Sequence, residues 1–351
     1  FDTDRLSRRS FRHLLTRGRA ATLVAVRAGA ILGYVLVLFS RGTSLARIYS
    51  LAVDPDSRGQ GLGRELVSAA EDAAQDQECS EMRLEVRKDN TEAIGLYEAL
   101  GYRRFGVLAD YYEDHQDALR YGKSLAPQLG LDMVRVPYYA QTTDFTCGPA
   151  ALLMAMGAHE PEMTLDRKLE LRVWREATTI FMTAGHGGCG PHGLALSAWH
   201  RGFGVTVYVN DRRPLLLDSV RSPEKKEVMR LVQEDMIEEL ATHGVPIHHR
   251  ALQPDELEAL FARGGIPLVL ISSYRIYAEK FPHWVVITGF DARYVYVHDP
   301  FVDEEEGESI ADCINMPIPR REFAAMSRYG RANQRAAVVI YPEREGRTGG
   351  D

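Results

Sequence analysis

Residues 51–64 read LAVDPDSRGQGLGR, an apolar run followed by a turn with glycines at positions 59, 61 and 63. The apolar run predicts the end of a strand, and the residues after the turn predict a helix over 64–75. Glycine lets backbone N–H groups converge on an anion, and the start of a helix adds partial positive charge. The stretch therefore indicates a diphosphate cradle, although the same glycines alone also fit an ordinary tight turn.

The surrounding sequence alternates strands with helices as far as about position 125. Gly101 stands where a left-handed residue ends the last of these helices. The apolar periodicities predict helices at 7–16, 64–75 and 91–100 and strands at 21–28, 30–40, 48–53 and 82–86. We expect residues 1–125 to form an α/β domain in which helices cover a mixed sheet.

Two linked patterns in this domain resemble the GNAT acyltransferases. Arg58-x-x-Gly61-x-Gly63 after Val-Asp-Pro matches their motif A, and residues 84–102, LEVRKDNTEAIGLYEALGY, resemble their second signature. The match is closest to the RimI-like branch, which acetylates protein N-termini, and it covers most of residues 1–124. The resemblance implies a GNAT fold. This chain departs from the family in one respect: the family's first strand and helix are expected before Asp4, and we expect them to be missing here.

The same resemblance implies an N-acetyltransferase that uses acetyl-CoA, or another acyl-CoA, as co-substrate. Glu85 aligns with the general base and Tyr97 with the acid that protonates the departing thiolate, because an amine must lose a proton to attack a thioester. The alternatives are that Glu85 is a solvated strand carboxylate and that Tyr97 simply packs on the sheet. The residues implied to hold the cofactor are Leu51, Ala52, Val53, Arg58, Gly59, Gln60, Gly61, Leu62, Gly63, Arg64 and, on the pantetheine side, Asn90.

A second domain is predicted at 134–342, after a linker at 126–133 and before a polar tail at 343–351 that we expect to be disordered. Its helical patterns come first and its strands later, so we expect an α+β fold. The predicted helices are 148–156, 164–183, 191–200, 223–242 and 256–262, and the predicted strands are 205–209, 267–272, 284–290, 294–298 and 336–341.

Cys147 stands at the start of a predicted helix in DFTCGPA, residues 144–150, where the helix dipole favours thiolate over thiol. A free cysteine is otherwise most often a small buried apolar residue. His283 begins a predicted strand, and Asp299 follows the next strand in His-Asp-Pro. Alone, these two residues also fit a satisfied strand-end histidine and a turn-forming Asp-Pro.

The order Cys, His, Asp, with His and Asp on neighbouring strands, is similar to that of papain-like peptidases. The short motifs that contain Gln141, Cys147, His283 and Asp299 specifically resemble those of the C39 and C39-like cysteine peptidases, and the resemblance spans 134–341. The resemblance implies that Cys147 is the nucleophile, His283 the general base and then acid, and Asp299 the group that fixes the imidazole tautomer. Gln141 would donate to the oxyanion beside the Cys147 amide, a donor worth roughly 3 kcal/mol of barrier.

Several other patterns are weaker evidence for a functional site. The segment 186–192 contains His186, Cys189 and His192 but no partner pair of the kind that structural zinc needs, so we expect no metal there and a flexible loop lining the peptide cleft instead. His243, His248 and His249 are expected to be solvated. The acidic run 303–308 is expected to be solvated too, or to attract a basic peptide. Trp174 and Trp199 are expected to belong to the core.

Composition excludes several function classes. The 351 residues carry 42 basic and 49 acidic side chains, so the net charge of −7 disfavours a nucleic acid partner. The longest apolar run, 28–39, is shorter than the roughly 20 residues of a membrane-spanning helix. Four scattered cysteines disfavour a disulfide scaffold and favour a reducing, cytoplasmic compartment.

These patterns predict a bifunctional enzyme that acts on a peptide or protein: an N-terminal N-acyltransferase joined to a C-terminal cysteine peptidase. One alternative is that the first domain is a non-catalytic module that recognises a peptide for Cys147. Another is that an amine captures the thioester at Cys147, which would make the second domain a transferase. The sequence does not name the peptide, the cleavage site, the acyl chain length or the oligomeric state.

Overall fold

The computed structural model describes residues 7–16, 19–112, 114–125, 132–133, 136–179, 187–217, 220, 222–279, 281–303, 308, 310–330 and 332–343. The chain divides into two units, Phe1–Leu129 and Gly130–Asp351, and each unit contains a hydrophobic core of its own.

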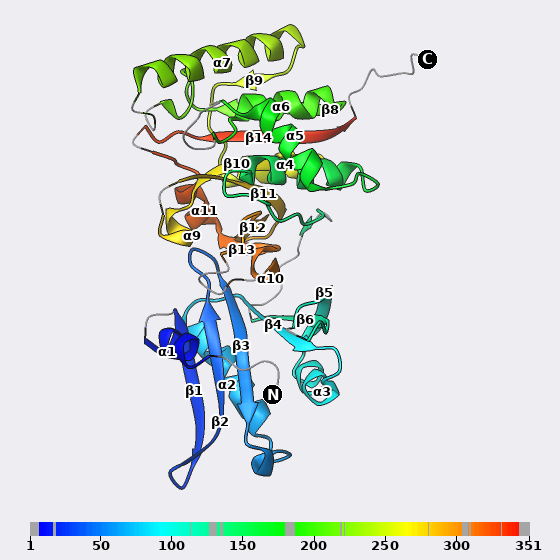
Figure 1. Ribbon diagram of the computed structural model, residues 1–351, viewed down its shortest axis with the longest axis vertical. Helices are drawn as coiled ribbons and strands as arrows, with labels where there is room; N and C mark the ends of the chain where they lie inside the picture. Colours follow the sequence, from blue (N-terminus) through cyan, green and yellow to red (C-terminus); the bar gives the residue numbers. More distant parts are fainter. Residues whose placement is uncertain are drawn as a thin grey trace. The chain divides into compact units, whose positions relative to one another are not determined.

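The first unit is built on one mixed sheet (Figure 1). Its described strands lie in the order β1-β2-β3-β4-β6-β5, and only β3 and β4 run parallel. Helix α2 packs against β1, β2 and β3. The strands are β1 (Ala20–Arg27), β2 (Ala30–Phe39), β3 (Leu45–Val53), β4 (Glu81–Arg87), β5 (Arg103–Leu108) and β6 (Ala118–Ser124); the helices are α1 (Arg8–Thr16), η1 (Pro55–Ser57), α2 (Leu62–Asp76) and α3 (Thr91–Ala99).

Local sequence signals explain most of these boundaries. Asn90 caps α3 by accepting a hydrogen bond from the Ala93 amide at 3.1 Å, and Gly101 follows the helix with a φ of 88°. The structure adds β5 and β6, which the sequence did not predict. The exposed pattern of β5 is that of an edge strand, and it contains no apolar alternation.

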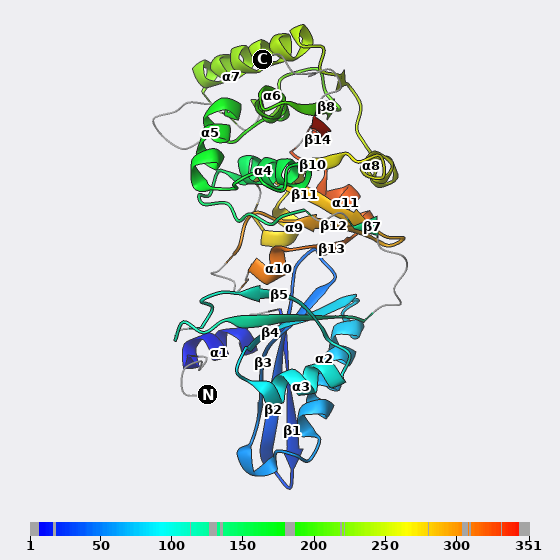
Figure 2. The same ribbon diagram turned by 90° about the vertical axis from the view of Figure 1, so that its right-hand side faces the viewer.

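The second unit is an α+β arrangement around a larger sheet. Its described strands lie in the order β13-β12-β11-β10-β14-β8-β9, with β7 paired to β11. Figure 2 shows α4 and α6 on one side of this sheet and α8 and α11 on the other. The strands are β7 (Asp132–Met133), β8 (Phe203–Val209), β9 (Ile247–His248), β10 (Ile266–Ser272), β11 (Pro282–Phe290), β12 (Tyr294–His298), β13 (Met316–Pro319) and β14 (Ala336–Glu343). The helices are α4 (Cys147–His159), α5 (Arg167–Ala177), α6 (Pro191–His200), α7 (Pro223–Thr242), α8 (Pro254–Phe261), α9 (Tyr274–Tyr277), α10 (Ile310–Cys313) and α11 (Arg320–Met326).

Strands β10 and β11 form the buried centre of this sheet. Every residue from Ile266 to Ile271 is buried, as is every residue from His283 to Phe290. A strand that is covered on both faces has a continuous apolar sequence, and such runs are what predicted these two strands. Helix α4 packs on both strands and is itself buried over most of its length.

Three predictions for this unit need correction. The helix predicted at 164–183 begins only at Arg167, because Asp166 accepts a hydrogen bond from the Leu169 amide and caps it, and it ends at Ala177. Of the linker predicted at 126–133, the last two residues form β7, and residues 126–131 lie outside the described residues. Glu343 belongs to β14, and the remainder of the predicted tail also lies outside them.

No helix among the described residues combines the length and the apolar character needed to cross a bilayer.

Candidate active sites

Strands β3 and β4 of the first unit diverge at the predicted cofactor site. Their parallel pairing runs from Leu45 opposite Glu81 to Ile48 opposite Leu84, whereas β3 continues to Val53. The register of β3 against β2 shifts at the same level, next to Tyr49, and such a bulge bends a strand. The edge of β3 that contains Leu51, Ala52 and Val53 therefore has no ladder to β4, and its backbone can pair with an extended ligand.

The glycine turn that follows β3 ends at the start of α2. Gly59 has a φ of 73° and Gly61 a φ of 86°, both in the left-handed region that favours glycine. A Cβ at either position would meet nothing within 4 Å, so open space lies in front of the turn. Gly61 caps α2 without a side-chain hydrogen bond, which leaves first-turn amides at Leu62, Gly63 and Arg64 to bind an anion.

These residues fit acetyl-CoA. The part of β3 that is not paired with β4 matches a pantetheine arm, and the start of α2, which has no side-chain cap, matches a diphosphate. Two side chains frame the turn: the Arg58 Nε donates to the Val53 carbonyl at 3.4 Å, and the Arg27 Nη1 donates to the Gln60 Oε1 at 2.9 Å. The amide oxygen of Asn90 accepts the capping bond from Ala93, and its amide nitrogen has no hydrogen-bond partner among the described residues, so it is free to donate to a pantetheine group.

Glu85, the predicted general base, is not a solvated carboxylate. It lies on β4 with only 5% of its side chain exposed, and its Oε2 is 2.7 Å from Nη2 of Arg47 on β3. The Arg47 Nε donates to the same oxygen at 2.7 Å, and its Nη2 also donates to the Tyr111 hydroxyl at 2.9 Å. The Glu85 carboxylate is thus engaged in a buried ion pair through Oε2. The sequence did not indicate Arg47, because its contact with Glu85 depends on the order of the strands.

Tyr97, the predicted acid, lies on α3 and is buried. Its ring packs edge-on against Tyr102 with centroids 5.7 Å apart. Burial raises the pKa of Tyr97 to about 12, which keeps the phenol protonated at neutral pH. The side chain packs in the core, as one sequence interpretation held, and the role of acid stays a prediction.

In the second unit, Cys147 is the first residue of α4. Gly148 lets this turn pack closely, since a Cβ there would lie 3.2 Å from Trp284 Cδ1 and 3.3 Å from Cys189 Cβ. The Trp284 Nε1 donates to the Cys189 carbonyl at 3.0 Å and ties β11 to the segment beside Cys147. Cys147 is therefore held at the start of a helix that packs against β11.

His283 and Asp299 lie together in the buried centre of the unit. His283 is near the start of β11 and Asp299 follows β12, its antiparallel neighbour. Nε2 of His283 is 2.6 Å from Oδ1 of Asp299, with side-chain exposures of 1% and 0%. Because Nε2 is engaged by the carboxylate, Nδ1 is the ring nitrogen that remains available to Cys147, which lies close enough to contribute to the raised pKa of His283.

The charge state of His283 follows from these partners. Burial alone lowers the pKa of His283, but the charge and hydrogen bond of Asp299, together with those of Cys147, outweigh burial and raise it to about 10. The imidazole of His283 is therefore charged at neutral pH. His283 and Asp299 are in direct contact, and Cys147 lies close enough to His283 to contribute to its pKa.

Asp299 has further hydrogen-bond donors. The Tyr277 hydroxyl donates to Oδ2 at 2.8 Å, and the Phe301 amide donates to Oδ1 at 2.9 Å. Tyr277 is a partly buried positioning residue that the sequence did not reveal, because it lies on a four-residue helix with no periodic pattern. Phe281, Tyr277 and Phe301 present ring edges around His283, with centroids 5.9, 6.0 and 6.5 Å from it.

Gln141, the predicted oxyanion donor, is engaged within its own loop. Its Nε2 donates to the Thr143 carbonyl at 2.9 Å, and its backbone amide donates to the Pro300 carbonyl at 2.8 Å, next to Asp299. The second Nε2 hydrogen remains for an oxyanion.

Two weaker predictions are revised by burial. Glu308 of the acidic run is not solvated: burial, with the charges of Asp312 and Asp299, raises its pKa to about 8; residues 304–307 lie outside the described residues. In the segment 186–192, Cys189 and His192 are buried, and burial lowers the pKa of His192 to about 4; His186 also lies outside the described residues. Trp174 and Trp199 pack against the core, as predicted.

The first unit has the GNAT acetyltransferase fold, and the second has the α+β fold of C39-like peptidases. The chain belongs to the Peptidase_C39 like family, whose model matches residues 136–341, and its first unit belongs to the Acetyltransferase (GNAT) family, whose model matches residues 2–102. The predicted resemblances and fold classes are therefore confirmed.

Relatives of the first unit carry names from protein acetylation. The chain is 35% identical over 112 residues to a putative [ribosomal protein bS18]-alanine N-acetyltransferase of Bacillus subtilis, covering 31% of this chain and 73% of the relative. It is 38% identical over 77 residues to the [ribosomal protein bS18]-alanine N-acetyltransferase of Escherichia coli, covering 21% of this chain and 52% of that enzyme. The chain thus spans only about half the length of the Escherichia coli relative. A crystal structure of the Escherichia coli ribosomal-protein-S18-alanine N-acetyltransferase matches with 27% identity and a TM-score of 0.32, over 35% of this chain and 79% of that one.

Proposed function

We propose that the chain is a bifunctional enzyme in which a cysteine peptidase and an acetyl-CoA-dependent N-acetyltransferase act on a peptide or protein. The observation that carries the peptidase assignment is the buried 2.6 Å contact between His283 and Asp299, with Cys147 close enough to contribute to the raised pKa of His283. The acetyltransferase assignment is supported by the open β3 edge and the glycine turn at the start of α2. Four cysteines without disulfides, among them the nucleophile, suit a reducing compartment such as the cytoplasm.

In the peptidase reaction, the Cys147 thiolate attacks the carbonyl carbon of the scissile bond. The oxyanion that forms is held by the backbone amide of Cys147 and by Nε2 of Gln141. The His283 imidazolium gives its Nδ1 proton to the leaving amine, so the C–N bond breaks and a thioester to Cys147 remains. His283, now neutral, takes a proton from water, which hydrolyses the thioester, and Asp299 holds the ring in place throughout.

In the acetyltransferase reaction, acetyl-CoA supplies an activated acetyl thioester. The amides at the start of α2 hold the diphosphate, and the β3 edge orients the arm. Glu85 draws a proton from the attacking amine, directly or through water, and Tyr97 donates its phenolic proton to the departing sulfur. The ion pair with Arg47 holds the Glu85 carboxylate in place on β4.

Mass spectrometry of peptides tests both assignments together. The full chain is incubated, with and without acetyl-CoA, with peptides encoded beside its gene. We expect cleavage without acetyl-CoA and addition of one acetyl group to an exposed amine when it is present. Cys147→Ala should abolish only cleavage and Glu85→Gln should lower only acetylation, so each variant is the control for the other. Cleavage by Cys147→Ala at the wild-type rate would overturn the peptidase assignment.

One observation favours a second candidate for the first unit. Because the Glu85 carboxylate is already engaged by Arg47 in a buried ion pair, the second candidate is a non-catalytic module that recognises the peptide for Cys147. Calorimetry with acetyl-CoA separates the two candidates. A module of this kind would give no binding heat, whereas an acetyltransferase binds acetyl-CoA at a site that depends on Gly61.

A further inference from the structure

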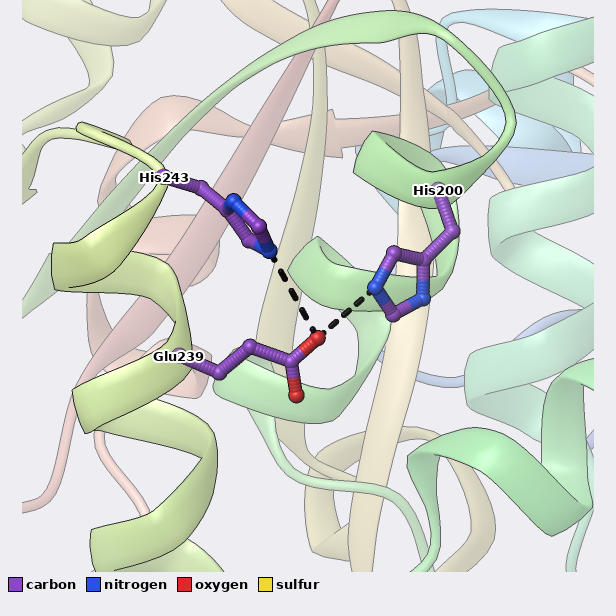
Figure 3. A group of neighbouring side chains, drawn as sticks. All are labelled: His200, Glu239 and His243. Atoms are coloured by element: carbon purple, nitrogen blue, oxygen red, sulfur yellow. Dashed lines mark hydrogen bonds and ion pairs between the residues drawn. The ribbon is translucent and has the colours of Figure 1, made fainter.

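The C-terminal ends of α6 and α7 bring two histidines and a glutamate together, apart from the peptidase residues (Figure 3). His200 is the last residue of α6, Glu239 lies in the last turns of α7, and His243 is the C-cap of α7. One nitrogen or oxygen atom from each residue lies within 4.8 Å of the other two. The sequence analysis treated His243 as solvated and did not connect it with the other two residues.

The three side chains converge on one point. Nε2 of His200 is 2.8 Å from Oε1 of Glu239, and Nε2 of His243 is 3.8 Å from the same oxygen. Figure 3 shows both imidazole rings turned toward this carboxylate. Zinc with ligands at roughly 2.0–2.2 Å in a tetrahedral site separates neighbouring ligand atoms by about 3.4 Å. The two observed spacings lie on either side of that value, so small side-chain rotations are enough to admit an ion.

The surroundings hold the imidazoles in this arrangement. Trp199 stacks on His243 with ring centroids 3.7 Å apart and an interplanar angle of 15°. The Trp199 and His200 rings meet edge to face, with centroids 5.4 Å apart. Glu239 and His243 are one helical turn apart on the same face of α7. The neighbouring cation Arg201 is held by Glu176 at 2.6 Å, which draws it toward a different carboxylate.

The exposure and chemistry of the cluster suit a metal ion better than a buried structural role. The side chains of His200, Glu239 and His243 are 44%, 39% and 31% exposed, so an ion can enter and a water can complete its shell. Two imidazoles and one carboxylate match zinc, whereas calcium and magnesium prefer oxygen ligands throughout.

We propose that His200, Glu239 and His243 form a Zn²⁺ site, with water as the fourth ligand, that joins the end of α6 to the end of α7. Helix α6 packs against α4, which begins with Cys147. The ion therefore stabilises a helix that supports the peptidase centre without taking part in its chemistry. This proposal is independent of either enzymatic activity.

Metal titration of the full chain tests the site. The Cys147→Ala variant is used as the parent protein, because a cysteine thiolate beside a histidine is itself a zinc ligand pair. Zn²⁺ is titrated in competition with a chromophoric chelator, and Co²⁺ is added separately for its visible spectrum. We expect one equivalent of Zn²⁺ to bind and four-coordinate Co²⁺ bands to appear. Zn²⁺ should also raise the melting temperature.

Substitutions in this parent assign the ligands. His200→Ala, His243→Ala and Glu239→Gln should each weaken Zn²⁺ binding at least tenfold and remove the Co²⁺ bands. His115→Ala is the matched control, because His115 also contacts a carboxylate, Asp110, at 2.6 Å, but the described residues bring no second imidazole into a cluster with it. Absence of zinc binding in the parent, or unchanged binding in the three ligand variants, would overturn the proposal.

Discussion

Nε2 of His283 lies 2.6 Å from Oδ1 of Asp299, and both side chains are almost completely shielded from solvent. Antiparallel pairing of β11 with β12 brings the two residues together, and the Tyr277 hydroxyl and the Phe301 amide complete the shell of the carboxylate. The charge and the hydrogen bond of Asp299 raise the pKa of His283 and so keep the imidazole charged at neutral pH. The protonation of His283 therefore depends on Asp299 more than on any other residue.

Asp299→Asn should lower the pKa of His283 below its ordinary value, because burial then acts with only Cys147 opposing it. Alkylation of Cys147 by iodoacetamide near neutral pH should slow at least about tenfold. The reason is that each unit by which the His283 pKa falls below the pH lowers the fraction of charged imidazole about tenfold. Mass spectrometry of the labelled peptides measures the rate. Cys79 is the internal control, because burial raises its pKa to about 11 in the other unit. Equal Cys147 rates in both proteins would contradict the prediction.

The same shift makes the stability of the second unit depend on pH. The folded-state pKa of His283, about 10, exceeds the ordinary 6.5. The stabilisation from this proton is therefore complete below about pH 6.5 and is lost as the pH rises through 10. Urea unfolding followed by tryptophan fluorescence reports on this unit alone, because Trp174, Trp199 and Trp284 all belong to it. We expect the midpoint to fall between pH 7 and 10 in the wild type. Asp299→Asn should lack that fall, and a parallel decline would refute the assignment.

Tyr277→Phe removes a hydrogen bond to a buried carboxylate and should lower the free energy of unfolding of the second unit by about 1.5–3 kcal/mol. The same fluorescence experiment measures the loss. Tyr341→Phe on β14 is the matched control, because the Tyr341 hydroxyl makes no hydrogen bond within the described residues and its removal should leave the unfolding free energy nearly unchanged. Similar losses for both variants would mean that the Tyr277 hydroxyl does not support Asp299.

The sequence predicts elements well where one local signal dominates. Ser222 and Pro223 start α7, and Gly101 ends α3, because capping and left-handed backbone need only neighbouring residues. β10 and β11 are marked by continuous apolar runs, because both faces are buried. In contrast, β5 and β13 are short strands at the edges of their sheets, and their pairing comes from neighbours distant in sequence.

The candidate sites divide in the same way. Short local motifs indicated Cys147, His283 and Asp299, and the pairing of β11 with β12 brings His283 and Asp299 together. No local motif indicated Arg47 or Tyr277. Arg47 meets Glu85 only because β3 and β4 are parallel neighbours, and a sequence without alignment does not give strand order.

The buried pair of Arg47 and Glu85 predicts an asymmetric mutational result. Arg47→Met leaves the Glu85 carboxylate buried without its guanidinium and should destabilise the first unit by about 3–5 kcal/mol. The double variant Arg47→Met with Glu85→Leu removes both charges and should recover most of that loss. Hydrogen exchange of peptides from β3 and β4, read by mass spectrometry, measures both effects. Equal exchange in the single and double variants would show that the pair is not coupled.

The glycine turn offers a test in which backbone conformation is separated from steric contact. Gly61 has a φ of 86° and open space where a Cβ would lie, so Gly61→Ala is opposed by conformation alone, at about 1–2 kcal/mol. If the turn must keep this shape to present the α2 amides, acetyl-CoA affinity should fall roughly tenfold, since 1.4 kcal/mol is a factor of ten.

Gly95→Ala is the matched control for that change. Gly95 lies inside α3, a Cβ there also meets nothing within 4 Å, and its φ is not in the left-handed region. Alanine in a helix interior should stabilise the unit by up to about 1 kcal/mol and leave acetyl-CoA affinity unchanged. Isothermal titration calorimetry of the full chain measures both variants. If Gly61→Ala bound acetyl-CoA as tightly as Gly95→Ala, the left-handed turn would not be what positions the diphosphate, and the cradle would have to be sought elsewhere along β3.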